Sequence, residues 1–299
     1  MQNRMSRPTS HAPHTPHSAF RTPHWVPLRT PHSALRTSRA FTLLELLTVI
    51  AIMGILAAIA LPSLRSLKPN SKVAATRQLL DAVGRARQLA MSQRTTVYMV
   101  FVSTNFYTDS ATSSWTPNDW VQATNLFDKQ LVGYAYVCLR SVGDQPGAHT
   151  PRYLSSWRTL PAGAYISLEK WAPANYSQPS VLTIPPTGLP TYKIYGFNYT
   201  TNVPFPAETN LSATLARPYV ALPYIAFDST GQLVSGQGDE LIPISEGSVS
   251  YVRNGDTKVA LAQPAQATER PAGNTTNDYS LVYIDRLTGR ARVERRKVQ

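Results

Sequence analysis

The longest apolar segment of the chain is Phe41–Leu61 (FTLLELLTVIAIMGILAAIAL), in which Glu45 is the only charged residue. A helix of this length extends roughly 31 Å, which is about the thickness of the hydrocarbon core of a bilayer. Pro62 follows the run directly and is expected to close it. The pattern therefore predicts a transmembrane helix over residues 41–62.

A second helical pattern follows the apolar run. In Ser63–Arg94, small and apolar residues recur at spacings of three and four, which places them on one face of a helix. Pro69 is expected to kink the join, and Ser71 is a candidate N-cap for the part that follows. We expect residues 63–94 to form an amphipathic helix that docks onto a globular domain. The apolar stripe contains Ala75, Leu79, Val83, Ala86 and Ala90, whereas Arg77, Asp81, Arg85 and Gln88 fall on other faces.

From Thr95 onward the apolar period changes to two, and β-branched and aromatic residues become frequent. Polar segments such as Asp109–Asp119 and Ala172–Pro190 are predicted to be loops. Arg286–Gly289 is predicted to be the turn of a final hairpin. The sequence thus predicts an α+β fold, with a long N-terminal helix and an antiparallel β-rich domain over residues 95–299. The predicted strands are Thr95–Val102, Leu131–Leu139, Ala164–Leu168, Tyr192–Tyr199, Tyr224–Phe227, Ser248–Arg253, Tyr279–Asp285 and Arg290–Arg295.

The first forty residues differ in composition from the rest. Met1–Ala40 contains six Arg, no Lys and no acidic residue, so it accounts for half of the net charge of +12 (12 − 6 = +6 for the remainder). Proline recurs every few residues, which argues against a helix or a core. We expect residues 1–40 to be a disordered basic leader that is removed.

The rest of the chain is poor in residues that carry chemistry. Cys138 is the single cysteine, and His149 is the single histidine after the leader. This excludes an intramolecular disulfide and argues against a zinc site or a His-based catalytic dyad. No nucleophile elbow, P-loop or H-E-x-x-H motif is present. We therefore expect no enzymatic activity, no cofactor and no metal.

One acidic stretch was weighed as a calcium site. Asp228, Asp239 and Glu240 lie in a glycine-rich segment, but their spacing lacks the alternating oxygen ligands of a calcium loop. The sequence favours a solvated turn.

Three interpretations of the apolar run are open. It is a secretory signal peptide with a cleavage site at Ala58-Ile-Ala60, an uncleaved anchor, or a processed assembly helix. Glu45 distinguishes these interpretations. A carboxylate inside a bilayer costs roughly 2.5–3.5 kcal/mol near its centre, and a simple anchor gains nothing from that cost. If the chain is cut after Ala40, Phe41 gains an α-ammonium that can pair with Glu45 of a neighbouring subunit. Such a pair offsets the cost of both charges and fixes the register between subunits.

The segment Phe41-Thr-Leu-Leu-Glu45 resembles the N-terminus of type IV pilins and type II secretion pseudopilins. The resemblance implies a leader cut by a prepilin peptidase after Ala40, N-methylation of Phe41, a functional Glu45 and a Pro at position 62. Ala40 departs from the family, because the residue before the cut is usually Gly, so slower processing is expected. Gly54 and Ala58 form a small-xxx-small pair that permits close packing between helices.

Three shorter segments narrow the resemblance to the H-type minor pseudopilins and their FimT-like relatives. Ala86-Arg87, followed by Arg94 and Val97, is similar to the helix-to-strand passage of that class. Ala226–Gly231 and Thr288–Val293 are similar to its later strand-and-turn segments. Residues 103–220 match nothing in the class and predict enlarged loops or extra strands.

The resemblance implies a partner set and a location. The partners are the prepilin peptidase, other pilin or pseudopilin subunits and the inner membrane. The chain is expected to cross the bacterial inner membrane once, with its C-terminal domain in the periplasm, before it enters a filament. Local counts of basic residues on the two sides of Phe41–Leu61 are equal, so charge alone does not decide the orientation.

Two other functions were considered. Gly289-Arg290-Ala291-Arg292 is similar to a strand with which DNA-uptake minor pilins bind DNA, and a basic cluster of this kind suits phosphates. The alternative interpretation of Arg290 and Arg292 is an edge strand protected by charge. A membrane-anchored enzyme is the more distant possibility, because catalytic groups are missing.

Overall fold

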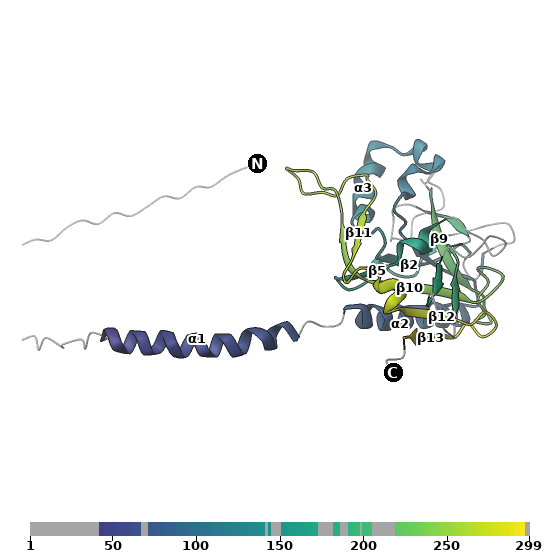
Figure 1. Ribbon diagram of the computed structural model, residues 1–299. Helices are drawn as coiled ribbons and strands as arrows, with labels where there is room; N and C mark the ends of the chain where they lie inside the picture. Colours follow the sequence, from purple (N-terminus) through teal and green to yellow (C-terminus); the bar gives the residue numbers. More distant parts are fainter. Residues whose placement is uncertain are drawn as a thin grey trace, which may run out of the picture. The chain divides into compact units, whose positions relative to one another are not determined.

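The computed structural model describes residues 42–66, 71–140, 143–144, 151–172, 182–185, 191–197, 199–204 and 219–296. The chain divides into two units, Met1–Pro62 and Ser63–Gln299. The first unit contains most of helix α1 (Leu43–Ser66), and the second contains helix α2 (Ser71–Gln93) and the β-rich domain (Figure 1). The predicted α+β class, with a helix at the N-terminal end, is confirmed.

Helix α1 extends further than expected. It continues through Pro62 to Ser66, so the prediction that Pro62 closes the first helix is wrong. Proline lacks an N–H donor, so one helical hydrogen bond is lost at this position, and α1 nevertheless continues to Ser66. In the part of the chain that the structure describes, no helix is both long enough and apolar enough to cross a membrane.

Helix α2 confirms the amphipathic pattern. Ala75, Leu79, Val83, Ala86 and Ala90 are all 0% exposed. They belong to one hydrophobic core with side chains from two sheets, so α2 docks by its apolar stripe. The other face of the helix is exposed at Arg77, Asp81, Arg85 and Gln88, as predicted. Ser71 is the first helical residue, and its hydroxyl donates to the carbonyl oxygen of Gly163 at 2.9 Å.

The first sheet has the strand order β3-β2-β1-β9-β8, with β4 also paired to β2. One face contributes to the core under α2, and the other face packs on a second core with helix α3 (Pro117–Phe127). All six residues of β2 are buried because both faces are covered. The strands are β1 (Val97–Phe101), β2 (Gly133–Cys138), β3 (Arg152–Tyr153), β4 (Arg158–Thr159), β8 (Thr200–Pro204) and β9 (Tyr219–Phe227).

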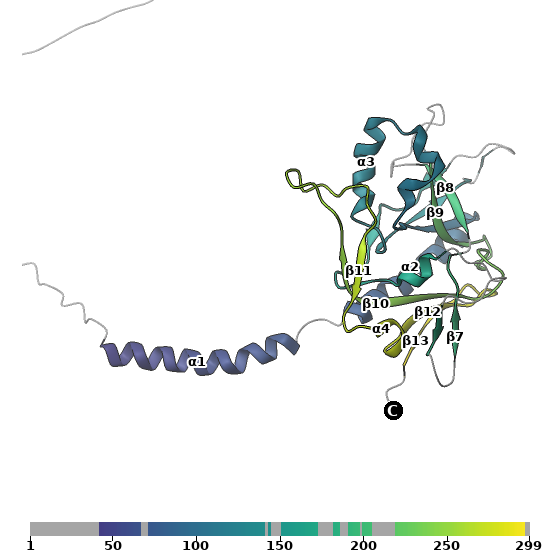
Figure 2. The same ribbon diagram turned by 45° about the horizontal axis from the view of Figure 1, so that its top comes forward.

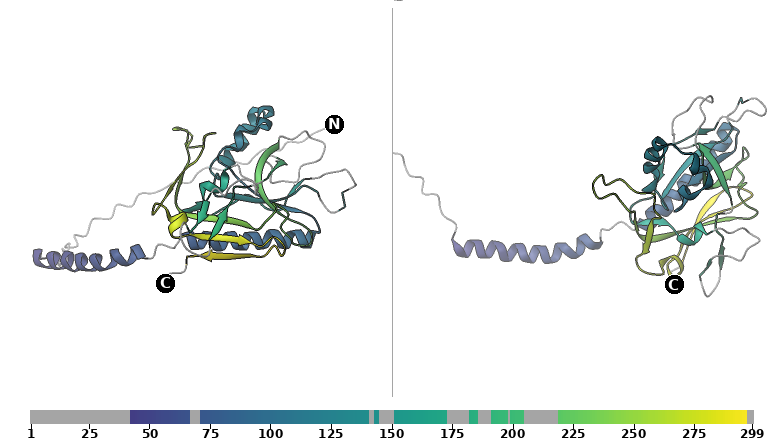
Figure 3. Two further views of the ribbon diagram at one scale, coloured as in Figure 1. Left: turned by 45° about the vertical axis from the view of Figure 1, so that its right-hand side comes forward. Right: turned by 90° about the horizontal axis from the view of Figure 1, so that it is seen from above.

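The second sheet is organised by one long strand, β10 (Glu240–Ser250). Along its length β10 pairs in turn with β12, β5 and β11, and β12 also pairs with β13. Helix α2 lies along β12 and β13, while the connection between β10 and β11 extends away from the sheet (Figures 1–3). The remaining elements are β5 (Ala164–Ile166), β11 (Gln266–Glu269), helix α4 (Asn274–Asn277), β12 (Ser280–Ile284), β13 (Ala291–Arg295) and a separate pair, β6 (Leu182–Ile184) with β7 (Tyr192–Ile194).

Most predicted strands are present, but three are wrong in extent. Strand β9 begins at Tyr219, five residues before the predicted Tyr224–Phe227. Only the first part of Ser248–Arg253 is strand, and it is the end of β10. Among the described residues of Tyr192–Tyr199, only Tyr192–Ile194 is strand, and Phe197 then turns inward. The Phe197 ring stacks on Phe101 with 4.9 Å between centroids, and its N–H donates to the carbonyl oxygen of Lys170.

Two predicted loops contain regular structure. The end of Asp109–Asp119 starts helix α3 through a capping box, in which Thr116 accepts from the Asp119 N–H and the Asp119 carboxylate accepts from the Thr116 N–H. Strand β6 lies within Ala172–Pro190. The described residues also form short 3-10 helices at Phe106–Thr108, Ser110–Ser114 and Leu168–Trp171. The region 103–220 therefore supplies α3 and strands β2 to β8 in its described parts.

Candidate functional site

The start of α1 is capped by Thr42. The Thr42 hydroxyl accepts from the backbone N–H of Glu45 at 3.2 Å, and the Thr42 carbonyl accepts from Leu46 at 3.1 Å. Glu45 therefore stands in the first helical turn, where the helix dipole favours a negative charge. The sequence analysis missed this role, although the Thr-x-x-Glu spacing at 42–45 is that of a capping box.

The large apolar side chains in the described part of α1, from Leu43 to Leu56, are exposed within their own unit. They are between 45% and 80% accessible. A Cβ placed on Gly54 would meet nothing within 4 Å among the described residues. A contiguous apolar surface of this kind requires an apolar environment or another apolar surface. The side chains are Leu43, Leu44, Leu46, Leu47, Val49, Ile50, Ile52, Met53, Ile55 and Leu56.

The other residues of the predicted assembly segment are only partly described. Ala40 and Phe41 lie outside the described residues. Ala58 and Pro62 are helical in α1, and their side chains lie outside the described part. The predicted cleavage site and the contact between Phe41 and Glu45 therefore remain predictions.

In the folded domain, Arg87 of α2 connects two distant turns. Its Nε–H donates to the carbonyl oxygen of Gly231 at 3.1 Å and to that of Thr288 at 2.9 Å. Gly289 follows Thr288 with a φ of 60°, and a Cβ there would come within 1.9 Å of the Gly231 oxygen. Only glycine fits this close approach.

This contact brings together the three segments that carry the resemblance to H-type minor pseudopilins. Ala86-Arg87 lies on α2, Ala226–Gly231 ends β9, and Thr288–Val293 forms the turn and strand β13. In the sequence these three segments lie far apart. No feature of the sequence indicated that the guanidinium of Arg87 would join the other two.

Both turns are closed by an aspartate. Asp285 Oδ1 accepts from the N–H and the hydroxyl of Thr288, both at 2.8 Å, and these bonds lower the pKa of Asp285. Asp228 Oδ1 accepts from the backbone of Thr230 and Gln232. Desolvation acts to raise the pKa of Asp228, but the hydrogen bonds prevail and lower it. Hydrogen bonds within the turns therefore favour the ionised form of both carboxylates.

The candidate DNA-binding residues lie at the exposed hairpin β12–β13. Arg290 precedes β13 and is exposed. Arg292 Nε lies 2.7 Å from a carboxylate oxygen of Glu294, and its guanidinium lies 3.8 Å from the centroid of the Tyr283 ring. Arg292 and Glu294 are two residues apart in β13 and so share one face. An acidic side chain therefore lies on the same face of the strand as Arg292.

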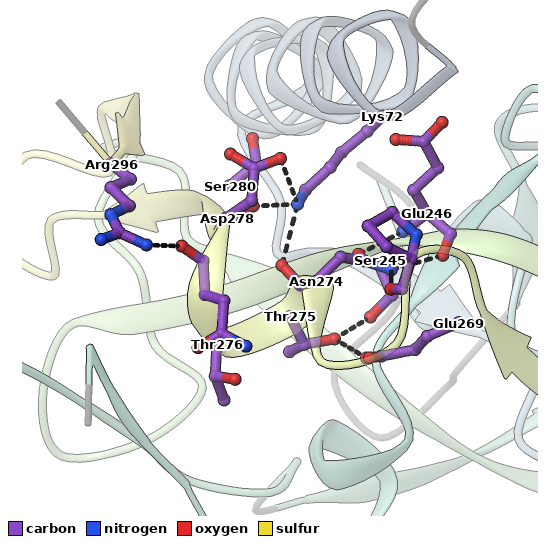
Figure 4. A network of polar contacts seen from close by, with 12 residues as sticks. Lys72, Ser245, Glu246, Glu269, Asn274, Thr275, Thr276, Asp278, Ser280 and Arg296 are labelled. Carbon is purple, nitrogen blue, oxygen red and sulfur yellow. Dashed lines mark hydrogen bonds and ion pairs between the residues drawn. The ribbon is translucent and has the colours of Figure 1, made fainter. Parts of the chain in front are cut away.

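A polar network holds the start of α2 (Figure 4). Lys72 is 3% exposed, and its ammonium donates to the carbonyl oxygens of Asn274 and Asp278 and pairs with the Asp278 carboxylate at 3.4 Å. Burial lowers the pKa of Lys72, against the opposing effect of Asp278, Glu246 and Glu269. The network ties the first turn of α2 to helix α4.

The acidic residues that were weighed as a calcium site have separate partners. Asp228 closes its own turn, Asp239 accepts from the Tyr283 hydroxyl and from the Arg286 N–H, and Glu240 forms a buried ion pair with Lys170. Across the described ranges, no group of three or more His, Cys, Asp or Glu side chains is placed to hold a metal ion.

Comparison with known proteins gives one match. Residues 35–61 match the family model described as the prokaryotic N-terminal methylation motif. No curated protein and no solved structure matches the chain. The match covers the predicted cleavage site, Glu45 and the apolar run.

Proposed function

We propose that this chain, which carries the prepilin-type N-terminal methylation motif of the type IV pilin and pseudopilin family, is a minor subunit of a secretion pseudopilus or of a type IV pilus-like filament. The match of residues 35–61 to that motif is the observation that carries the proposal. The exposed apolar surface of α1 supports it, because a subunit needs such a surface for the membrane and then for its neighbours.

The first step is processing at the leader. A prepilin peptidase hydrolyses the peptide bond between Ala40 and Phe41, which leaves a free α-amine on Phe41. This amine is then N-methylated. The leader, residues 1–40, is released on the cytoplasmic side.

The second step is assembly through α1. Phe41 and Glu45 are one helical turn apart, so the carboxylate of an incoming subunit reaches the new ammonium of its neighbour and sets the axial register. Gly54 and Ala58 lie four residues apart on one side of the helix and allow close approach of a neighbouring helix. Before assembly, α1 anchors the subunit in the inner membrane as a single span, and the domain from Ser71 onward is periplasmic.

The H-type class is supported by the contact of Arg87 with Gly231 and Thr288. Each partner in this contact comes from a segment that is similar to that class, and the contact is structural rather than catalytic. DNA binding by Arg290 and Arg292 is the second candidate function. It is supported by the exposure of Arg290, Arg295 and Arg296 and opposed by the pairing of Arg292 with Glu294.

The assembly proposal is tested with Glu45→Ala in the full chain, expressed with its own assembly machinery. The fraction of processed subunit in sheared filaments or in cross-linked oligomers is measured. We expect Glu45→Ala to be processed but to fall at least about tenfold in the assembled fraction, which corresponds to 1.4 kcal/mol. Asp81→Asn removes an exposed carboxylate from α2 and is the matched control. Normal assembly of Glu45→Ala would refute the proposed role of Glu45.

A further inference from the structure

A pocket of about 820 Å³ lies at the C-terminal end of α2. It is lined by the residues that follow the helix and by parts of the first sheet, including Arg94, Tyr98, Leu139, Arg140, Asn202 and Tyr219. The chain enters the domain at Ser71, at the opposite end of α2, about 34 Å away for 23 residues. The pocket therefore uses a different part of the chain from the proposed assembly segment, and its size suits a small ligand or a short peptide.

Two arginines in this pocket have no partner. Both Arg94 and Arg140 are exposed, and no hydrogen bond or ion pair of their guanidinium groups is found within the described ranges. Three other arginines of the domain, Arg87, Arg253 and Arg286, each donate to a backbone carbonyl oxygen, whereas the exposed Arg77 and Arg85 on α2 do not line this pocket. Unpaired guanidinium groups that line a pocket are suited to a carboxylate or a phosphate.

A hydrogen bond joins the two segments of the chain that carry the arginines. The hydroxyl of Thr95 donates to the carbonyl oxygen of Arg140 at 2.7 Å, which joins the end of α2 to the end of β2. Arg94 has a φ of 48°, a left-handed conformation that ends the helix. The fold therefore fixes the backbone positions from which both arginines extend.

The charged residues that line the pocket indicate which kind of anionic ligand fits it. Asp144 and Asp228 also line it; Asp228 is engaged by its own turn, and Asp144 has a partner. Two arginines in the lining are enough to pair with one or two carboxylates, whereas a polyphosphate binds by neutralising several phosphates in a row and needs more cationic groups than these. A nucleic acid is therefore the poorer fit.

The rest of the lining suits a peptide. Tyr98 packs edge-on against Tyr224 with 5.1 Å between centroids, and Tyr219 is 40% exposed. Tyrosines of this kind offer apolar area to a side chain and a hydroxyl to a backbone group. Leu139 and Pro151 add apolar surface, and Asn202 on edge strand β8 adds a donor and an acceptor.

We propose that this pocket binds an acidic peptide segment of a partner protein, in which one or two carboxylates pair with Arg94 and Arg140 while a neighbouring apolar side chain packs on Tyr98 and Tyr219. This gives the subunit a recognition site for a client or partner subunit that is separate from α1. The proposal does not depend on how the chain is assembled.

The test uses the full chain in detergent micelles and a library of fluorescent hexapeptides, each with two Glu and one aromatic residue at varied positions. A matched library carries Gln in place of Glu. Binding is measured by fluorescence anisotropy for the unchanged chain and for the double variant Arg94→Asn with Arg140→Gln. Asparagine is chosen because it tolerates the left-handed conformation at position 94. The matched control is Arg77→Gln with Arg85→Gln, which removes two exposed arginines from α2.

We expect members of the Glu library to bind at least about tenfold more tightly than their Gln counterparts, with an affinity that falls as salt is added. The double variant should lose this preference and the control should keep it. Circular dichroism establishes that both variants are folded. The proposal is overturned if no Glu peptide binds, if Gln peptides bind equally well, if the double variant binds as the unchanged chain does, or if oligothymidylate binds more tightly with the same dependence on Arg94 and Arg140.

Discussion

The Nε–H of Arg87 lies 2.9 Å from the carbonyl oxygen of Thr288, although 201 residues separate them. The same N–H donates to the carbonyl oxygen of Gly231. One guanidinium on α2 therefore fixes the end of the first sheet and the hairpin of the second sheet against the same helix. The three segments that it joins are those that carry the resemblance to the H-type minor pseudopilins.

Removal of the Arg87 side chain should destabilise the domain. Arg87→Ala leaves two carbonyl oxygens without their charged donor, and we expect the free energy of unfolding to fall by about 1–3 kcal/mol. Denaturant unfolding followed by tryptophan fluorescence measures the change. The control is Arg85→Ala, an exposed position on the same helix, which should alter stability by less than about 0.5 kcal/mol. Equal effects of the two substitutions would show that the Arg87 contact is not needed.

A substitution at Gly289 tests the close approach of the two turns. Gly289→Ala places a Cβ within 1.9 Å of the Gly231 oxygen at a left-handed residue. We expect a loss of more than about 2 kcal/mol in unfolding free energy, from backbone strain together with the clash. Gly84→Ala is the matched control, because that glycine lies within α2 and a Cβ there meets nothing within 4 Å. The control should be neutral or stabilising by up to about 1 kcal/mol. A tolerated Gly289→Ala would contradict the described approach.

The sequence predicted those parts of the fold in which local pattern and tertiary packing agree. The stripe from Ala75 to Ala90 has the period of a helix and is buried, and the hairpin β12–β13 has alternating strands around the turn Asp285–Arg290. Strand β10 was missed over most of its length. Pro243, Glu246 and Gly247 interrupt its alternation, and three neighbouring strands nevertheless pair with it along its length.

The candidate site was predictable to a smaller extent. The pattern around Glu45 lies within one continuous segment, so the sequence was sufficient to find it. The pairing of Arg87 with Gly231 and Thr288, and the pocket of Arg94 and Arg140, join residues that are far apart in the chain. The hydrophobic periodicity of one segment does not indicate which distant segment its side chains contact.

The buried ammonium of Lys72 predicts a pH dependence. Burial places the pKa of Lys72 in the folded state below its ordinary value of 10.5, so the unfolded chain holds more protons as the pH approaches 10.5. The contribution of Lys72 to the unfolding free energy therefore increases with pH in the range just below 10.5 and is constant at pH values below the folded-state pKa.

Lys72→Met removes this titrating group. We expect the unchanged chain to gain stability relative to Lys72→Met as the pH is raised from about 8 to 10, measured by denaturant unfolding at each pH. The difference between the two proteins cancels the contributions of tyrosines that titrate nearby. Parallel stability curves for the two proteins would contradict the buried state of Lys72.

The DNA-binding alternative gives a separate prediction. Because Arg292 is paired with Glu294, we expect only weak, salt-sensitive binding of the full chain to duplex DNA. This binding should decrease equally in Arg290→Ala with Arg292→Ala and in Arg77→Ala with Arg85→Ala, measured by anisotropy at low salt. A selective loss in the first double variant would favour the DNA-uptake function instead.

The mass of the mature N-terminal peptide, measured on protein isolated from the membranes or filaments of its native cells, is the most direct test of the proposed function. The account predicts that the peptide begins at Phe41 and is one methyl group heavier than the unmodified sequence. A mature chain that retains residues before Phe41, or that begins after Ala60 as a signal-peptide cleavage would leave it, would contradict the account.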